Sequence, residues 1–591
     1  MAVPFAPGNS DLPSSYENPG VYFQLRSNGA GAAASAPSKR ALIRAHKLPG
    51  GSGQFNSPVR CPGLQQAILY AGQGSDAVRA YQAFTSQAGN GTADVFLMLV
   101  PDPSTTGAQA TRTIIVAGAP SIAGSVDIWV CGYPLSVRIS MSDTPTTIAA
   151  AIAGAINAIA DLPVTAAPNV GTITLTYRHF GFVGNDIPVM VNQTDAAGIT
   201  FSPGTITFAN PATGAGAAIV SIGGTTISTT IINNETAANV GVGVRTSINA
   251  GSYPVSAADD GNGVVTLFYV ANRVVNKISA AIVTSTVITA TVSCGVVVPN
   301  NSANRPALTT ALANLANQDG GFRTWLSTWN DSTTIGTQAA SIEINANGLY
   351  QKEQFLFVGS TDGIVTAGAL PMSTTPALAG LWRYAVICEP DSPQQAYEVA
   401  ARAAAMVAVE DYAPRNYDGA ELHTDPAQRI PFLLPHPAVR IAPGSDDAQM
   451  ALHTYGLCPV CVTADGRQVI AKGRSTWQTD AGAFRDWGGG QHVGYMRLRF
   501  IAVGSALIAG KNIRRNGPAH SPNVLTLESI RDALIAEAAR LDGLDLYDGV
   551  AAFKDAFRFN FDPNVPDRVN GYVPLAVIRS LHQLGLVGDP Q

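Results

Sequence analysis

Residues 94–100 read Asp-Val-Phe-Leu-Met-Leu-Val and are followed directly by Pro101. A continuous apolar run of this length predicts a strand that is buried on both faces. Residues 39–47 predict a second strand, and residues 62–71 and 75–88 predict two helices between the strands. This order indicates a βαβ-type unit, in which helices cover the sheet of a mixed α/β core.

The length and composition of the chain exclude several classes of protein. A chain of 591 residues exceeds the roughly 250–300 residues at which one hydrophobic core stops growing, so we expect several domains. Charged residues make up 13% of the chain, against about 25% in ordinary soluble domains, and the net charge is -5. A surface so poor in charge suits contact with protein, and it offers no basic field for nucleic acid.

The sequence predicts a protein made in the cytoplasm. The start of the chain lacks the basic and apolar segments of a signal peptide, and no apolar run approaches the roughly 18 residues of a membrane span. Six cysteines scattered over this length indicate reduced thiols.

Between residues 111 and 297 the chain becomes rich in short Thr/Val/Ile strands and repeats itself at a spacing close to 92 residues. The matched positions include Gly132 with Gly224, Asn157 with Asn249, Thr174 with Thr266, and the stripe Ile148, Ile152, Ile156 with Val240, Val244, Ile248. Each copy predicts a strand, a tight turn, a strand, a helix and two strands, and Pro145 begins the first helix. We interpret residues 111–205 and 206–297 as a tandem duplication of one small β-rich α+β domain.

After residue 298 the composition of the first segment returns. A helix over Ala307–Gln318, strands over Glu353–Val358 and Trp382–Cys388, and an alanine-rich helix over 394–406 are predicted, in that order. The duplicated pair is therefore predicted to be inserted into one core domain, which comprises residues 38–110 and 298–552.

Further along the core, the sequence predicts a strand at Gly494–Val503, a helix at Thr526–Leu541 and a core hairpin at Cys458–Lys472. The residues singled out in this core hairpin are Cys458, Cys461, Asp465, Gly466, Val469 and Ile470, with Asp465-Gly466 at the turn. Residues three apart on a strand point to opposite faces, so we interpret the two cysteines as buried small side chains and not as a redox or zinc pair.

No pattern typical of an enzyme is present. The eight histidines form no HxxxH or HExxH motif, and His179 is expected in a loop after a strand with a structural role. The glycines at 488–490 are interpreted as a loop that lacks the lysine of a phosphate site. We therefore predict no catalytic residues, no cofactor and no metal.

The chain is predicted to begin and end in extended arms. Residues 19–26 alternate apolar and polar side chains between a proline-rich leader and the Gly/Ala-rich segment 28–37. A lone strand between linkers must add to the edge of a sheet, either in its own domain or in another subunit. The arm occupies 1–37, and its strand residues are Val21, Tyr22, Phe23, Gln24 and Leu25. The C-terminal arm, 553–591, alternates Phe557, Phe559 and Phe561.

These features predict an α+β fold, with a mixed α/β core whose helices flank a mixed sheet, two tandem insert domains and extended terminal arms. In this form the chain resembles contractile tail sheath proteins of bacteriophages, in particular the Mu-like branch. Three stretches are similar to that family. They are the arm motif at 19–23, the hairpin region from Tyr455 to Trp477, and two insert motifs at 143–149 and 178–187.

The resemblance implies a structural virion protein. Its subunits would polymerise as a helical sleeve around the tail tube and contract to drive the tube through the host envelope. The implied partners are copies of the same chain, the tail tube protein, the baseplate and the tail terminator, without direct contact to nucleic acid or insertion into a membrane. The implied location is the virion, and the host cytoplasm during assembly.

Two alternatives remain open at this point. An adhesin or surface-layer protein would also carry Thr/Gly-rich duplicated domains, although the sequence shows no export signal. Sheath proteins usually end in a long apolar strand that is donated to a neighbour, whereas the segment after residue 574 is short here. Phe557, Phe559 and Phe561 could supply that exchange strand instead.

Overall fold

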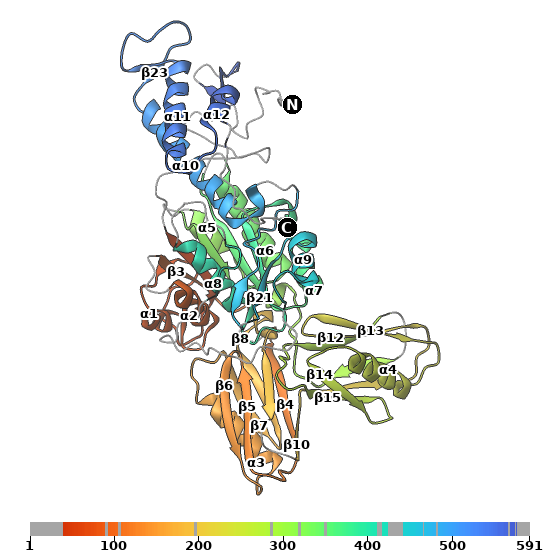
Figure 1. The fold of residues 1–591 in the computed structure, drawn as a ribbon. Helices are drawn as coiled ribbons and strands as arrows, with labels where there is room; N and C mark the ends of the chain where they lie inside the picture. Colours follow the sequence, from red (N-terminus) through yellow and green to blue (C-terminus); the bar gives the residue numbers. More distant parts are fainter. Residues whose placement is uncertain are drawn as a thin grey trace, which may run out of the picture.

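The computed structural model describes residues 39–88, 93–103, 108–193, 198–283, 288–316, 321–347, 351–409, 417–422, 441–464, 466–479, 483–564, 568–573 and 575. Within them, the elements group around one large sheet, two β-rich units and a helical C-terminal segment (Figure 1). The predicted α+β class is confirmed.

The core is an eight-stranded mixed sheet. Its order is β2 (Val59–Arg60), β3 (Asp94–Val100), β1 (Arg40–His46), β18 (Thr324–Ser327), β19 (Phe355–Ser360), β20 (Tyr384–Cys388), β21 (Cys458–Val462) and β22 (Gln468–Ile470). The strands from β3 to β21 are parallel, and β2 and β22 pair antiparallel at the two ends. The strands predicted at 39–47, 94–100, 353–358 and 382–388 are confirmed as β1, β3, β19 and β20.

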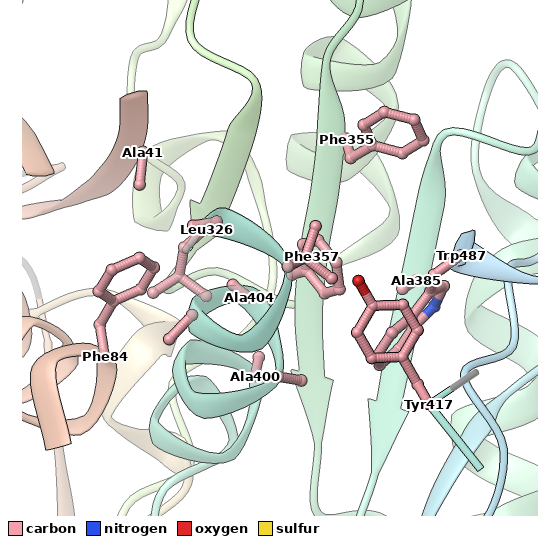
Figure 2. Close-up of a cluster of buried hydrophobic side chains, with 14 of the residues drawn as sticks. Ala41, Phe84, Leu326, Phe355, Phe357, Ala385, Ala400, Ala404, Tyr417 and Trp487 are labelled. Atoms are coloured by element: carbon pink, nitrogen blue, oxygen red, sulfur yellow. The ribbon is translucent and has the colours of Figure 1, made fainter. Parts of the chain in front are cut away.

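Helices α2 (Asp76–Ala88) and α8 (Ala396–Ala408) pack on one face of this sheet. The small side chains of α8 permit this close packing, because a Cβ at Gly359 of β19 would collide with the backbone of Ala396. Figure 2 shows Ala400 and Ala404 of α8 between Phe84 of α2 and Phe357 of β19. The predicted alanine-rich helix and its packing against the sheet are confirmed.

The remaining core helices surround the sheet. They are α1 (Leu64–Ala71), α5 (Thr309–Ala316), α6 (Ser332–Ala346), α7 (Ile364–Ser373) and the short α9 (Asp446–Gln449). The second hydrophobic cluster contains Leu42 of β1, Trp325 of β18 and Ile335 of α6, and it continues into the first insert copy through Ile187 and Val189. The sheet and this copy therefore share one core.

The duplicated segment forms two similar units. The first contains β4 (Gln109–Gly118), β5 (Gly124–Val130), β6 (Tyr133–Ile139), α3 (Pro145–Asn157), β7 (Val164–Asn169), β8 (Thr172–Phe180), the 3-10 helix η1 (Phe182–Asn185), β9 (Val189–Gln193) and β10 (Ile199–Ser202). The second contains β11 (Gly204–Ala209), β12 (Gly216–Ile222), β13 (Thr225–Ile231), α4 (Ala237–Ala250), β14 (Val255–Asp259), β15 (Val264–Tyr269), β16 (Ile278–Val283) and β17 (Thr289–Val292). Each unit has one three-stranded and one four-stranded sheet.

The matched residues of the repeat have the same structural roles. Gly132 and Gly224 both adopt positive φ, 85° and 79°, in the tight turn of a hairpin. Asn157, at the end of α3, donates to the carbonyl of Ala166 and accepts from its amide, at 2.7 and 2.9 Å. Asn249 makes the same pair of bonds with Ala257, at 2.8 and 2.9 Å. Each asparagine thus ties its helix to the following strand.

The C-terminal segment is led by α10 (Trp487–Ile508), which spans about 33 Å at 1.5 Å per residue. It continues through β23 (Asn512–Ile513), β24 (Val524–Leu525), α11 (Leu527–Asp542), α12 (Val550–Ala556), β25 (Arg558–Phe561) and β26 (Val569–Tyr572). Helix α11 confirms the helix predicted at 526–541, and Thr526 caps it. Figure 1 shows this segment at the opposite end of the core from the insert copies.

Two predictions for this segment are wrong. The strand predicted at Gly494–Val503 lies inside α10, and the glycines at 488–490 form the first turn of that helix instead of a loop. Val493, Met496 and Phe500 are buried at helical spacing, so tertiary packing overrides the strand preference of the Val, Ile, Tyr and Phe residues here. No helix within the described ranges is both long and apolar enough to cross a membrane.

Candidate functional site

The predicted site residues lie in the two arms, which are predicted to act in assembly, and in the core hairpin. The N-terminal strand residues Val21, Tyr22, Phe23, Gln24 and Leu25 lie outside the described residues. The core hairpin is described except for Asp465, and residues 553–564, 568–573 and 575 of the C-terminal arm are described.

The core hairpin joins β21 to β22, with Cys461 opposite Val469 and Val460 opposite Ile470. Gly466 takes a positive φ of 83° at the turn. Cys458 and Cys461 are free and buried in different hydrophobic clusters on the two faces of the sheet. Burial raises the pKa of both thiols, to about 12 for Cys461, so the interpretation of two inert buried cysteines agrees with their placement.

The outer edge of β22 is already covered. The amide of Gly419 donates to the carbonyl of Ile470, and the amide of Ile470 donates to Ala420, both at 2.8 Å. The amide of Leu422 donates to Gln468 at 2.9 Å. Residues 417–422 therefore pair with this end of the sheet, which leaves no free edge at β22 for an added strand.

The C-terminal aromatics form a second hairpin. Strand β25 pairs antiparallel with β26, and Phe559 lies opposite Gly571. A side chain at Gly571 would collide with the Phe559 ring, so a larger residue there would force the ring to move. Among the described residues, no further strand pairs with either edge of this two-stranded sheet.

Of the predicted exchange residues, Phe557 is anchored and Phe561 is partly exposed. Phe557 is buried and packs on Phe553 of α12 and on Phe559, with ring centroids 4.8 and 4.7 Å apart. Phe561 lies under the guanidinium of Arg515, 4.7 Å from the ring centroid. The predicted start of the C-terminal arm at residue 553 falls within α12.

A buried ion-pair network holds α10 to the sheet. Glu353, which precedes β19, accepts hydrogen bonds from Arg497 of α10 at 2.7 Å and from Arg383 at 3.1 Å. Burial alone would raise the pKa of Glu353, but the two guanidinium groups outweigh it and lower that pKa. This carboxylate therefore joins α10 to Arg383, which directly precedes β20.

A second polar cluster joins the core to the first insert copy. His46 ends β1, Asp76 begins α2, and His179 lies near the end of β8. The Nδ1 atom of His46 lies 3.3 Å from Asp76 Oδ2, and His179 Nε2 lies 3.4 Å from Asp76 Oδ1. Asp102 Oδ1 lies 2.9 Å from His179 Nδ1. The expectation that His179 occupies a loop is wrong, since it is a fully buried residue of a strand.

Within this cluster, His179 and Asp76 each favour the charged form of the other. Burial would lower the pKa of His179, but Asp76 and Asp102 outweigh it and raise that pKa. Burial would raise the pKa of Asp76, and the nearby His179 and His46 lower it overall. Sequence reasoning missed this cluster because His179 is far along the chain from the strands that it meets. The only signal was that His46 lies at the end of one buried strand and Asp102 follows another.

The comparisons with known proteins concern the sequence and the fold. No protein-family model matches the chain. The chain is 28% identical over 183 residues to the Mu-like prophage FluMu tail sheath protein of Haemophilus influenzae. The match covers 31% of this chain and spans only 37% of the length of that relative. It confirms the resemblance to Mu-like tail sheath proteins, and it names a structural component instead of an enzyme.

Solved tail sheath structures are also similar. The chain resembles the sheath tail protein of Desulfitobacterium hafniense at 10% identity and a TM-score of 0.38, covering 92% of this chain and 94% of that one. It resembles the sheath tail protein of Listeria innocua at 10% identity and a TM-score of 0.40, covering 93% and 94%. At TM-scores below 0.5 these likenesses do not by themselves establish a shared fold.

Proposed function

We propose that this chain is the subunit of a contractile phage tail sheath, which assembles as a helical sleeve around the tail tube. The observation that carries the proposal is the 183-residue match to a Mu-like prophage tail sheath protein. Contraction would be a shift of subunits into a packing of lower free energy, and it would drive the tube into the host for genome delivery. The proposed partners are copies of the chain, the tail tube protein, the baseplate and the tail terminator. The proposed location is the virion, with assembly in the host cytoplasm.

Subunits would be linked by strand addition. The arm strand at residues 19–26 would leave its own subunit and pair with a sheet edge of a neighbour. The hairpin β25–β26 is the favoured acceptor, because both of its edges lack a strand among the described residues, whereas residues 417–422 cover β22. Backbone hydrogen bonds to a tethered strand would let subunits rotate while they remain joined.

The duplicated units would face away from the tail tube. They lie at the opposite end of the core from the C-terminal hairpin (Figure 1). A surface that carries two extra domains is poorly suited to close packing against a tube. We propose the division into terminal arms (1–37 and 553–591), a core (38–110 and 298–552) and two inserts (111–205 and 206–297).

Electron microscopy of the purified full chain tests the function. Hollow sleeves of regular diameter are expected, and deletion of residues 1–27 should leave dispersed subunits with the melting temperature of the full chain. A planar lattice from the full chain would favour a surface-layer protein and would contradict the proposal. Normal sleeves from the deletion variant would contradict only the role of the arm.

A second variant tests the place of the inserts. The first copy shares its hydrophobic core with the sheet, so removal of the whole segment 111–297 would expose apolar surface. The second copy can be removed more cleanly, because Gly204 and Cys294 are neighbours where it begins and ends. A variant in which Gly204 is joined directly to Cys294 should still form sleeves, but thinner ones. Loss of assembly by this variant, with folding intact, would contradict the outward position.

A further inference from the structure

The residues His46, Asp76 and His179 form a buried group whose three candidate ligand atoms lie within 4.8 Å of one another. All three side chains are at most 1% exposed. We propose that this group binds one divalent transition-metal ion, with Zn²⁺ the best match, and that the ion fastens the first insert copy to the core sheet.

The position of the group in the fold is typical of a binding site. In the sheet, β1 lies between β3 and β18. The strand β3 is therefore added on one side of β1, and the later strands from β18 onward are added on its other side. Such a switch point opens a crevice at the carboxyl ends of parallel strands. His46 ends β1, Asp102 follows β3, and Thr328 follows β18, so all three lie at that edge. His179 of the insert covers the crevice from outside.

The distances suit one ion between the three residues, with each imidazole facing a different oxygen of Asp76. Bonds of 2.0–2.1 Å to nitrogen and oxygen place neighbouring ligand atoms about 3.4 Å apart. The separation of His179 Nε2 from Asp76 Oδ1 is 3.4 Å, and that of His46 Nδ1 from Asp76 Oδ2 is 3.3 Å. The Oδ1 atom of Asp76 is buried and accepts no hydrogen bond, so it is a free ligand atom that faces His179.

Surrounding groups hold the ligands in place. His179 Nδ1 lies 2.9 Å from Asp102 Oδ1, so an Nδ1–H would donate to that carboxylate and leave the Nε2 lone pair facing Asp76. Thr328 Oγ1 donates to Asp76 Oδ2 at 3.2 Å. Carboxylate–histidine–metal arrangements of this kind fix the tautomer and raise the basicity of the ligand.

Two contacts compete with the ion. The Nε1–H of Trp329 can only donate and lies 3.3 Å from both ring nitrogens of His46, so an ion on Nδ1, which leaves the proton on Nε2, would replace this contact. The backbone amide of Asp76 donates to His179 Nε2 at 3.3 Å, which is a long hydrogen bond that metal binding would replace. The charge balance favours the ion, because the carboxylates of Asp76 and Asp102 together neutralise two positive charges beside two neutral imidazoles. Nitrogen and oxygen donors without thiolate suit zinc or a neighbouring first-row metal.

The second insert copy cannot form the same site. At the repeat spacing that matches Thr174 with Thr266, His179 corresponds to Ala271. The second copy is instead tied to the core by ion pairs such as Lys277 with Asp362. The proposal therefore predicts one ion per chain, which joins only the first copy to the sheet.

Metal content and spectroscopy test the proposal on the untagged full chain, kept as dispersed subunits. One equivalent of Zn²⁺ per chain should remain bound after dialysis against chelator. The Tm of the chain with Zn²⁺ should be several degrees higher than that of the metal-free chain. Co²⁺ in place of Zn²⁺ should give visible absorption bands of a tetrahedral site. H46Q and D76N should each lower Zn²⁺ affinity at least 10-fold. H492Q changes a buried histidine of α10 outside the group and should leave the affinity unchanged.

The outcomes distinguish a bound metal ion from a cluster held together by hydrogen bonds alone. Retention of less than about 0.1 Zn²⁺ per chain, with no Co²⁺ bands, would overturn the proposal and leave a purely hydrogen-bonded cluster. If H46Q or D76N fails to fold, the Zn²⁺ stoichiometry and the Co²⁺ spectrum of the unaltered chain still show whether one metal ion is bound. Equal loss of Zn²⁺ in H492Q would also overturn the assignment to these residues. Sleeve formation is a separate measurement, so failure here leaves the proposed function intact.

Discussion

Replacement of Glu353 by Gln should destabilise the core severely. The Glu353 carboxylate is 5% exposed and lies between Arg497, which is fully buried, and Arg383, which is 6% exposed. E353Q preserves the volume but removes the buried charge that contacts both guanidinium groups. Arg383 keeps its ion pair with the partly exposed Glu343, at 3.0 Å. Loss of one partner from a buried ion pair costs about 3–5 kcal/mol of the free energy of unfolding. Arg497 keeps the carbonyl of Asn347, 2.6 Å from its Nη2, which softens the loss.

Differential scanning calorimetry of dispersed subunits at pH 7 measures this cost. A domain of 150–250 residues loses roughly 2–4 °C per kcal/mol and a larger one loses less, so the transition of the larger core should fall by no more than about 6–10 °C. The matched control is D94N, because Asp94 pairs with Arg60 at the surface, where an ion pair is worth no more than about 1 kcal/mol. A fall in E353Q no larger than in D94N would refute the reasoning that this network holds α10 to the sheet.

Three further outcomes are expected. The pKa of Glu353 is lowered in the folded chain, so its contribution to stability is complete above its ordinary pKa of 4.5 and is lost as pH falls through the lower value. The free energy of unfolding should therefore fall less steeply with decreasing pH in E353Q than in the unaltered chain. N157A and N249A should each lower the free energy of unfolding by about 1–3 kcal/mol, because each unpairs two backbone groups. In chemical denaturation, the double variant should lose the sum of the two, because the sites lie in separate units. A loss that differs from the sum would contradict the independence of the units. G571A should displace Phe559 from β26 and reduce sleeve formation in electron microscopy, with the Tm of the core unchanged.

The elements whose local pattern and tertiary role agree could be predicted from the sequence. After its first residue, Asp94, strand β3 is apolar and mostly buried, and the bounds predicted for it match those observed. The repeat was visible in the sequence because equivalent positions have equivalent roles. Gly132 and Gly224 adopt positive φ, and Asn157 and Asn249 bond to the backbone of the next strand, and few other residues can fill these roles.

Helix α10 could not be predicted in the same way. The Tyr, Phe, Ile and Val residues after Gly494 favour a strand, and the packing of Met496 and Phe500 against the core selects a helix. The buried cluster was invisible for a different reason. His46, Asp76 and His179 are brought together by sheet order and by an insertion, and neither leaves a fixed spacing in the sequence.

The central claim is that subunits complete a sheet with a strand borrowed from a neighbour. A cryo-electron microscopy map of the assembled sleeve, in which residues 19–26 are traced from residue 39 backwards, measures this directly. The account predicts that this strand enters an adjacent subunit and pairs with a sheet edge there. A strand that pairs within its own subunit, while the sleeve still forms, would contradict it.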